Sequence, residues 1–327
     1  MLEPLRRYGP GLALAATVAG FARLLDAGGF GAALIFALLL GMLVRPLAEM
    51  QSAAAGVDFA AKHLLAVAVA LLGVRLTVGD IAAVGIAPAL VVAAALVLTL
   101  AFSFYAARLL GLTDNVGILA GGGTAFCGAS AAVAIASVLP KKPGLERDTA
   151  LVIAGVVALS AIAMIVYPLV VIFLGFDDLR AGIFLGGSIH NVPQAVAAGM
   201  TVSQTAGDTA TLTKLYRVSL MAPFVLALAI AYGRRRGASL TSIELPWFVI
   251  AFALMVAASS LGLIPDQAKG ALTTVSGWLM LVAVAAIGMK TSLDAMRTVG
   301  ARVIALLILN SLVLAGILLA ALLAGVV

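Results

Sequence analysis

Two short stretches combine glycine with polar side chains inside otherwise apolar segments of this 327-residue chain, at residues 121–130 and 186–194. A helix that is interrupted inside lipid leaves backbone N–H and C=O groups without partners, so an interruption is tolerated only where it lines a protected cavity. Many secondary transporters build a midplane binding site from the ends of such half-helices. The two stretches therefore predict a solute site within a membrane.

In the first stretch, consecutive glycines are expected to expose backbone amides and to let a ligand approach closely. A helix that restarts near Ala129 would present unpaired N–H groups and a partial positive charge, which favour an anion. The alternative is that these small residues only allow close helix packing. Cys127 is expected to be a small buried thiol, because no activating base stands near it in the sequence. The substrate contacts predicted here are Gly121, Gly122, Gly123, Thr124, Cys127, Gly128 and Ser130.

The second stretch places His190, Asn191 and Gln194 within five residues of one another. Each such group, buried without a partner, costs about 1–3 kcal/mol. Pro193 removes a backbone donor and loosens the turn before it. Clustering at a helix break favours ligand contact over hydrogen-bonded packing, and Ser188 joins the predicted substrate contacts.

Lys214 and Arg217 stand three residues apart and so share one face of the next helix. A cation near a helix end can extend to water, whereas one deeper in the membrane would attract an anionic substrate. We include both residues in the predicted site. Arg75 and Lys290 carry the same two alternatives.

Acidic residues such as Asp26, Asp114 and Asp208 all fall at or near predicted loops. A cation exchanger commonly needs a carboxylate buried in the membrane, so the cargo is expected to be a small anion. The alternative is a monovalent cation/proton antiporter. The chain has no metal-ligand spacing, phosphate loop or nucleophile elbow, and we expect neither an enzyme nor a bound cofactor.

The composition indicates the class of protein that positions these residues: 64% of the chain is hydrophobic and only 10% is charged. Soluble domains carry about a quarter charged residues. A single domain, residues 1–327, is therefore predicted to be an all-α polytopic membrane protein, because one span needs about 20 apolar residues. The apolar segments lie at 11–25, 30–47, 61–79, 83–107, 116–139, 149–175, 181–203, 211–232, 246–263, 271–289 and 302–325.

Lysines and arginines cluster on one side if these eleven segments alternate, which predicts a cytoplasmic N-terminus and a periplasmic C-terminus. Because the net charge of +6 is spread over segment ends, such as Arg108 and Arg234–Arg236, no nucleic acid is expected as a partner. The basic loop 141–147 fits the rule only if segment 116–139 re-enters, and segment 181–203 must then re-enter from the other side. The chain therefore has either eleven crossings or nine crossings with two opposed hairpins.

Two internal echoes suggest repeats. Gly117-Ile118 and Gly121-Gly122 recur 65 residues later as Gly182-Ile183 and Gly186-Gly187, and Gly73–Thr77 resembles residues 288–292. In the hairpin arrangement both pairs run in opposite directions through the membrane, as inverted-topology repeats require.

Several motifs in matching order make the chain resemble the YeiH-type family of proposed sulfate exporters, which are bacterial inner-membrane proteins. The motifs are Phe59–Leu65, Leu71–Thr77, Cys127–Ala131, Ser188–His190 with Gln194–Val196, and Lys214–Arg217 with Pro223. The resemblance implies kinship with cation/proton antiporters and anion transporters built from inverted repeats, with a core part that holds broken or re-entrant helices and a scaffold part. It also implies a homodimer.

From the two interrupted stretches and this resemblance we predict transport of a sulfate-like oxyanion, a sulfonate or a carboxylate by alternating access. Na⁺ coordinated by unwound carbonyls is the expected coupling ion, with H⁺ on His190 as the alternative. Relatives in this family often carry an acidic residue directly after the histidine, where this chain has Asn191. Coupling through a carboxylate at that position is therefore not expected here.

Overall fold

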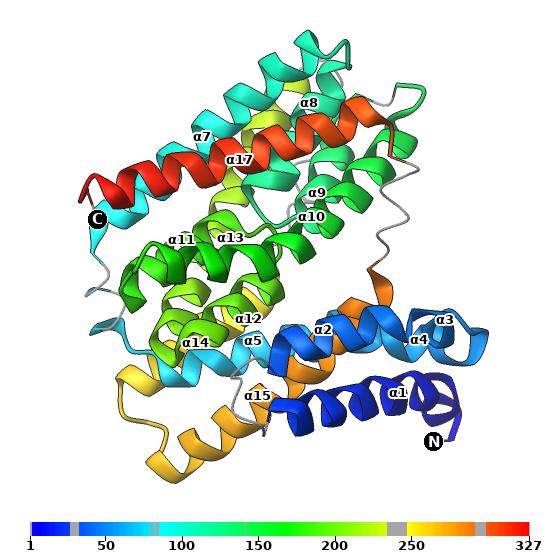
Figure 1. Cartoon of the computed structure of the whole chain (residues 1–327), viewed down its shortest axis with the longest axis vertical. Coiled ribbons are helices and arrows are strands. Elements are labelled where there is room, and N and C mark those ends of the chain that lie inside the picture. Colours follow the sequence, from blue (N-terminus) through cyan, green and yellow to red (C-terminus); the bar gives the residue numbers. More distant parts are fainter. Residues whose placement is uncertain are drawn as a thin grey trace.

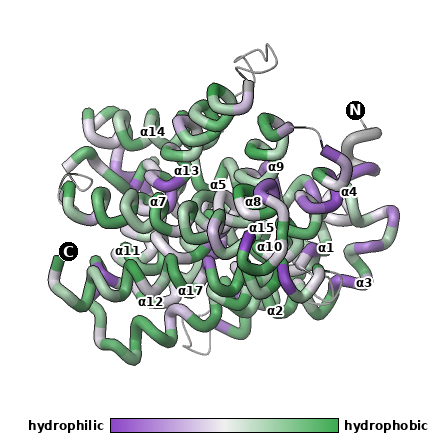
Figure 2. Tube along the Cα trace, turned by 90° about the horizontal axis from the view of Figure 1, so that it is seen from above, coloured by the Kyte–Doolittle hydropathy of each residue, from purple (hydrophilic) through white to green (hydrophobic). Residues whose placement is uncertain are grey.

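The structure is a computed structural model and describes residues 2–26, 33–79, 82, 85–140, 142–233, 247–291 and 299–326. Within these residues the regular secondary structure is entirely helical, and apolar residues dominate most of the trace (Figure 2). Seven of the described helices are long and apolar enough to cross a bilayer. The prediction of an all-α polytopic membrane protein is confirmed.

The described helices fall in all eleven predicted segments, except α4, which lies between two of them (Figure 1). Their bounds are α1 (Leu2–Asp26), α2 (Ala33–Leu43), α3 (Arg45–Ala48), α4 (Gln51–Phe59), η1 (Ala60–Leu64), α5 (Leu65–Leu72), η2 (Gly73–Arg75), α7 (Ile86–Leu109), α8 (Asp114–Ala125), α9 (Ala129–Val138), α10 (Leu145–Phe173), α11 (Asp178–Ser188), α12 (Val192–Val202), α13 (Gln204–Gly233), α14 (Trp247–Ser260), α15 (Asp266–Lys290) and α17 (Ala301–Leu323).

Several predicted boundaries are wrong. The residues left between the predicted segments 30–47 and 61–79 contain α4, whose helix continues through η1 into α5. The segments predicted to begin at residues 11, 211 and 271 begin at Leu2, Gln204 and Asp266. In these cases the helix includes polar residues, which hydropathy excludes but a helical backbone tolerates. Residues 141, 234–236 and 292, used above for orientation and the repeats, lie outside the described residues.

The helices separate into two parts, seen above and below each other in Figure 1. The hairpin part consists of α7–α13 and α17, and the flanking part consists of α1–α5, α14 and α15 together with η1 and η2. The main helix contacts between the parts are those of α12 with α2 and α15. Because this interface is narrow, the hairpin part packs mostly against itself.

Helices α8 and α9 fold back on each other as a hairpin. A Cβ on Gly122 of α8 would lie 2.0 Å from Cδ1 of Ile135, two turns into α9, so the two arms lie side by side. A hydrogen bond from Arg108 and, to a smaller extent, the charge of Lys142 lower the pKa of the Asp114 carboxyl. Lys142 lies just before α10, so the residues at the start of α8 and after α9 lie at the same end of the hairpin.

Helices α11 and α12 form a second hairpin against the first half of α13. Gly182 of α11 faces Ala206 and Thr209, and Gly199 of α12 faces Ala206 and Gly207, so both arms lie at one level of α13. The first hairpin packs near the start of α10, where Gly123 faces Val152 and Val156, and α11 begins beyond the other end of α10. The hairpins therefore enter the hairpin part from opposite ends, as the alternative with two opposed hairpins requires.

Candidate functional site

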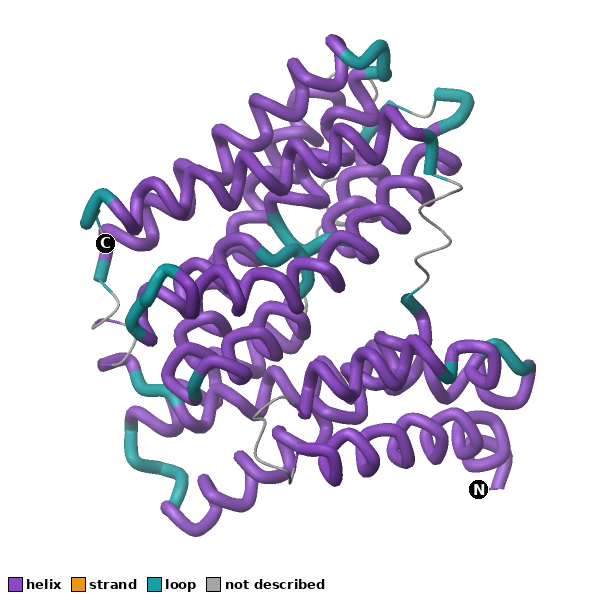
Figure 3. Tube along the Cα trace, viewed as in Figure 1, coloured by secondary structure: helices purple, strands orange, loops and turns teal. Residues whose placement is uncertain are grey.

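The two helix breaks meet in the interior of the hairpin part, where Figure 3 shows loop backbone among the surrounding helices. The first break is Phe126–Gly128, between α8 and α9, and the second is Ile189–Asn191, between α11 and α12. The prediction of two interrupted helices whose ends face each other agrees with this geometry.

The three glycines lie before the break, so the prediction that they expose backbone amides to a ligand there is wrong. Gly121, Gly122 and Gly123 are helical, and the alternative reading, close packing, describes them. A Cβ at Gly121 would lie 2.8 Å from Cβ of Ser103 on α7. Their small size lets α7, α9 and α10 approach, and the break follows one turn later.

Gly128 allows the first break because its φ of +64° disfavours any residue with a Cβ. A Cβ there would also lie 2.3 Å from Oδ1 of Asn191 in the other break. Pro193 is in the first turn of α12, where the missing N–H has no helical partner to lose. Glycine and proline thus let the two ends come into direct contact.

Lys214 of α13 joins the two breaks. Its Nζ donates hydrogen bonds to the carbonyl oxygens of Phe126, at 2.7 Å, and Ile189, at 2.6 Å. The side chain is 0% exposed. The alternative that this cation extends to water is therefore wrong.

Arg217, one turn later on α13, binds the same helix ends and is also 0% exposed. Its Nε donates to Ala125 O at 2.8 Å and its Nη2 to Thr124 O at 2.8 Å. Its Nη1 donates to Ile189 O at 3.0 Å and to Gly186 O at 3.2 Å. A single guanidinium thus satisfies carbonyl groups at the ends of both α8 and α11.

These contacts sort the four helix ends by charge. The C-terminal ends of α8 and α11 carry partial negative charge, and the two cations of α13 are bound there. The N-terminal ends of α9 and α12 carry partial positive charge, and neither has a side-chain cap. Among the described residues, Lys214 and Arg217 form no salt bridge with a carboxylate. The centre of the hairpin part is therefore electropositive.

Several polar side chains at this centre have unused hydrogen-bonding capacity. Asn191 donates from Nδ2 to Oε1 of Gln194 at 3.0 Å, which leaves Nε2 of Gln194 buried without a partner in the described structure. The hydroxyl of Thr124 is likewise buried and unpaired there. An unpaired buried donor costs about 1–3 kcal/mol, so these donors suit a ligand that accepts hydrogen bonds.

His190 contacts α17. Its Nε2 lies 2.9 Å from Oγ of Ser311, and the Ser311 hydroxyl donates to Leu307 O. His190 is 0% exposed. Sequence reasoning did not include Ser311, because its partner is 121 residues away in the chain.

Of the remaining residues predicted to contact substrate, some pack within the protein and others are exposed or half-buried. Ser188 donates to Phe184 O of its own helix, and the Cys127 thiol lies 3.7 Å from Sδ of Met221. Ser130 is exposed and Asn191 is half-buried. Ser160 of α10 accepts a hydrogen bond from the Asn191 amide at 3.0 Å and so holds the second break in place.

Comparison with known proteins supplies the family. The family model described as "Conserved hypothetical protein 698" matches residues 10–307. The UPF0324 membrane protein TauZ of Paracoccus denitrificans is 43% identical over 312 residues, covering 94% of this chain and 92% of that protein. The UPF0324 membrane protein CT0845 of Chlorobaculum tepidum is 41% identical over 313 residues, covering 94% and 87% respectively.

A third relative, the UPF0324 membrane protein RB0971 of Rhizobium meliloti, is 42% identical over 320 residues, covering 97% of this chain and 93% of that protein. No solved structure matches the chain. These matches confirm the family resemblance inferred from the motifs. The chain belongs to the family of conserved hypothetical protein 698, the UPF0324 membrane proteins.

Proposed function

We propose that this protein is a secondary transporter of a small anion, a sulfate-like oxyanion, sulfonate or carboxylate, which it carries across the bacterial inner membrane by alternating access. The observation that supports the proposal is the charge sorting at the two breaks. Lys214 and Arg217 are bound at the negative ends of α8 and α11, so the positive ends of α9 and α12 remain for a ligand. The unpaired donors of Gln194 and Thr124 lie at the same place.

The alternative, a monovalent cation/proton antiporter, lacks comparable support. Such an exchanger commonly needs a buried carboxylate, and in the described part of the chain the buried charged residues are Lys214 and Arg217 alone. In the proposed orientation the N-terminus and the basic loops are cytoplasmic. An inverted repeat that relates the two hairpins and a homodimer are further parts of this proposal.

Binding can be tested by the thermal stability of the detergent-purified protein in the presence of sulfate, methanesulfonate or acetate. A ligand at 100 times its Kd stabilises the folded state by about 2.7 kcal/mol. Gln194→Ala and Asn191→Ala are expected to abolish the rise in unfolding temperature. Ser137→Ala, an exposed change on α9 away from the break, should retain it. Equal rises in all four proteins would remove the site assignment.

Transport itself needs a flux measurement in sealed vesicles that contain the purified protein. Radiolabelled anion should accumulate with the parent protein and not with Gln194→Ala. A proton-sensitive dye in the same vesicles tests the alternative, because an antiporter would change the internal pH when sodium or potassium is added. That change without anion flux would overturn the anion assignment.

A further inference from the structure

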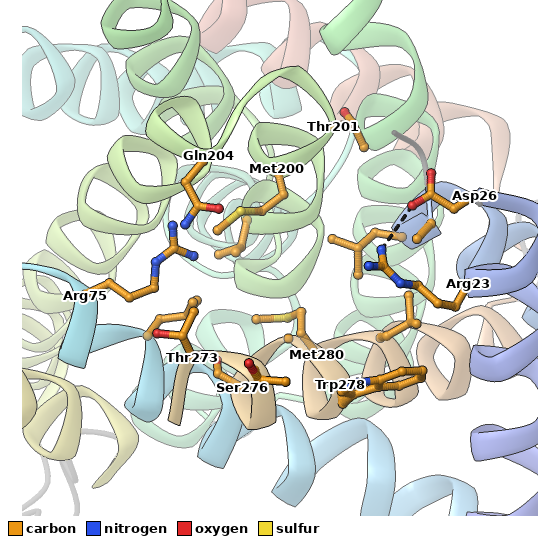
Figure 4. Close-up of a pocket in the computed structure, with 17 residues that line it drawn as sticks. Arg23, Asp26, Arg75, Met200, Thr201, Gln204, Thr273, Ser276, Trp278 and Met280 are labelled. Carbon is orange, nitrogen blue, oxygen red and sulfur yellow. Dashed lines mark hydrogen bonds and ion pairs between the residues drawn. The ribbon is translucent and has the colours of Figure 1, made fainter. Parts of the chain in front are cut away.

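A cavity of about 500 Å³ lies between the two parts of the molecule. Figure 4 shows it bounded by α1, α2, η2 and α15 of the flanking part and by α12 and the start of α13 of the hairpin part. None of the break residues described above lines it. Its volume falls within the range of small-molecule sites, about 300–1,000 Å³.

Arg75, at the end of η2, is the main charged group on one wall. Its Nη2 donates to Oδ2 of Asp208 at 2.9 Å, and the side chain is 13% exposed. In the described part of the chain Arg75 makes this one hydrogen bond. A guanidinium has five N–H donors. Figure 4 shows the guanidinium beside Gln204 at the edge of the cavity. Arg75 can therefore offer a planar pair of donors to a second anion.

The rest of the wall is mixed. Leu72, Val196, Met200, Met280 and Leu281 supply apolar surface. Hydroxyl groups interrupt that surface, among them Thr273 on α15. Arg23, on the opposite side in Figure 4, binds Asp26 at 3.2 Å. Such a wall suits a small molecule that is charged at one end and apolar at the other.

We propose that this cavity is a second anion site and that it binds a small organic anion with a short apolar body, such as an alkanesulfonate or a monocarboxylate. The anionic group pairs with Arg75, and the apolar body contacts Met200, Met280 and Leu281. This binding goes beyond the transport function proposed above and does not depend on the helix breaks.

The same contact gives the bound anion an effect on the molecule. Arg75 belongs to the flanking part and Asp208 to the hairpin part, so their ion pair is a link between the parts. An anion that binds Arg75 competes with the Asp208 carboxylate for the guanidinium. Occupation of the cavity therefore weakens that link.

The chain offers its own reporter of the cavity. It has two tryptophans, and one of them, Trp278, lines the cavity. A Trp247→Phe variant leaves Trp278 as the single indole, and its fluorescence can be titrated with 1-propanesulfonate in the full-length purified protein. We expect a saturable change, with much weaker binding of inorganic sulfate, which has no apolar body.

Three variants in this background decide the assignment. Arg75→Gln should weaken propanesulfonate binding at least tenfold. Asp208→Asn should tighten it, because the competing charge is removed. Lys269→Gln is the matched control. Like Arg75→Gln it removes one positive charge, but Lys269 lies near the start of α15 and does not line the cavity. The Trp278 titration of this variant should therefore match that of the parent protein.

An unchanged titration in Arg75→Gln would overturn the proposal, and so would a response to phosphatidylglycerol without one to propanesulfonate. If Arg75→Gln does not fold, Asp208→Asn carries the test, and unchanged or weaker binding in it counts against the site. Gln194→Ala should leave the Trp278 titration intact. If the parent protein shows no anion-induced rise in unfolding temperature but a normal Trp278 titration, only the break site is contradicted. If it shows the rise in unfolding temperature but no Trp278 titration, only this cavity is contradicted.

Discussion

Buried cations at the helix breaks take the position in which an unwound helix would otherwise hold a metal ion. Lys214 binds the carbonyls of Phe126 and Ile189, and Arg217 binds those of Thr124, Ala125 and Gly186. Such carbonyls coordinate Na⁺ in other transporters with broken helices. Here, two tethered positive charges already satisfy them, so we propose that anion binding needs no sodium.

The first prediction follows from this replacement. The rise in unfolding temperature that an anion causes should be the same in sodium and in choline buffers of equal ionic strength. Lys214→Ala, which removes one donor from each of the carbonyls of Phe126 and Ile189, should lose the rise in choline and recover part of it in sodium. A parent protein that binds the anion only in sodium would contradict this prediction and support Na⁺ as the coupling ion.

The limits of the sequence are visible at these two cations. Their spacing of three residues predicts a shared helix face and nothing about what faces it. The carbonyl partners of Arg217 on α8 lie 92 and 93 residues away in the chain, and backbone groups leave no trace in a sequence. Gln194 and Asn191 were predictable because polar side chains in an apolar segment stand out by type alone.

At the scale of the helices, the two hairpins determine how the breaks meet. Hydropathy measures the length of an apolar segment, and a 24-residue segment can either cross a membrane or return to its starting side. In the structure the two arms of each segment pack side by side, since Gly122 faces Ile135 in α9 and Gly199 faces the same turn of α13 as Gly182. The basic loop 141–147 favours the hairpins on charge alone.

The second prediction tests this arrangement by cysteine labelling. Cys127 is the single cysteine, so Cys127→Ala gives a background without thiols. Leu112→Cys and Lys142→Cys should react with an impermeant maleimide from one side of sealed vesicles, and Asp178→Cys and Thr205→Cys from the other side. Labelling of positions 112 and 142 from opposite sides would mean that α8 and α9 cross the membrane instead.

A third prediction concerns how tightly α11 packs on α13. A Cβ on Gly186 would lie 2.4 Å from Ala210 O, a backbone atom that cannot easily move. Gly186→Ala should therefore destabilise the protein by about 1–3 kcal/mol, as overpacking does. Gly277→Ala on α15, where nothing lies within 4 Å, should be neutral or stabilise by up to about 1 kcal/mol. Unfolding temperatures of the two variants should move in opposite directions, and a matching fall would contradict the packing argument.

At the scale of the whole molecule, the narrow interface between the two parts suits a relative movement. The main helix contacts across it are those of α12 with α2 and α15, and the ion pair between Arg75 and Asp208 adds one specific link. Both proposed anion sites depend on the hairpin part, one inside it and one along its boundary. Movement of this part against the flanking part would carry the break site from one side of the membrane toward the other.

The last prediction follows from that movement. In the Cys127→Ala background, Arg75→Cys with Asp208→Cys can be joined by a short bifunctional methanethiosulfonate, which ties the flanking part to the hairpin part. Anion flux should fall to background and return after reduction, while the thermal shift caused by anion at the break site persists, because the tie touches neither break. Each single-cysteine variant treated with the same reagent is the control. Full flux through completely cross-linked protein would mean that transport does not require the two parts to move against each other.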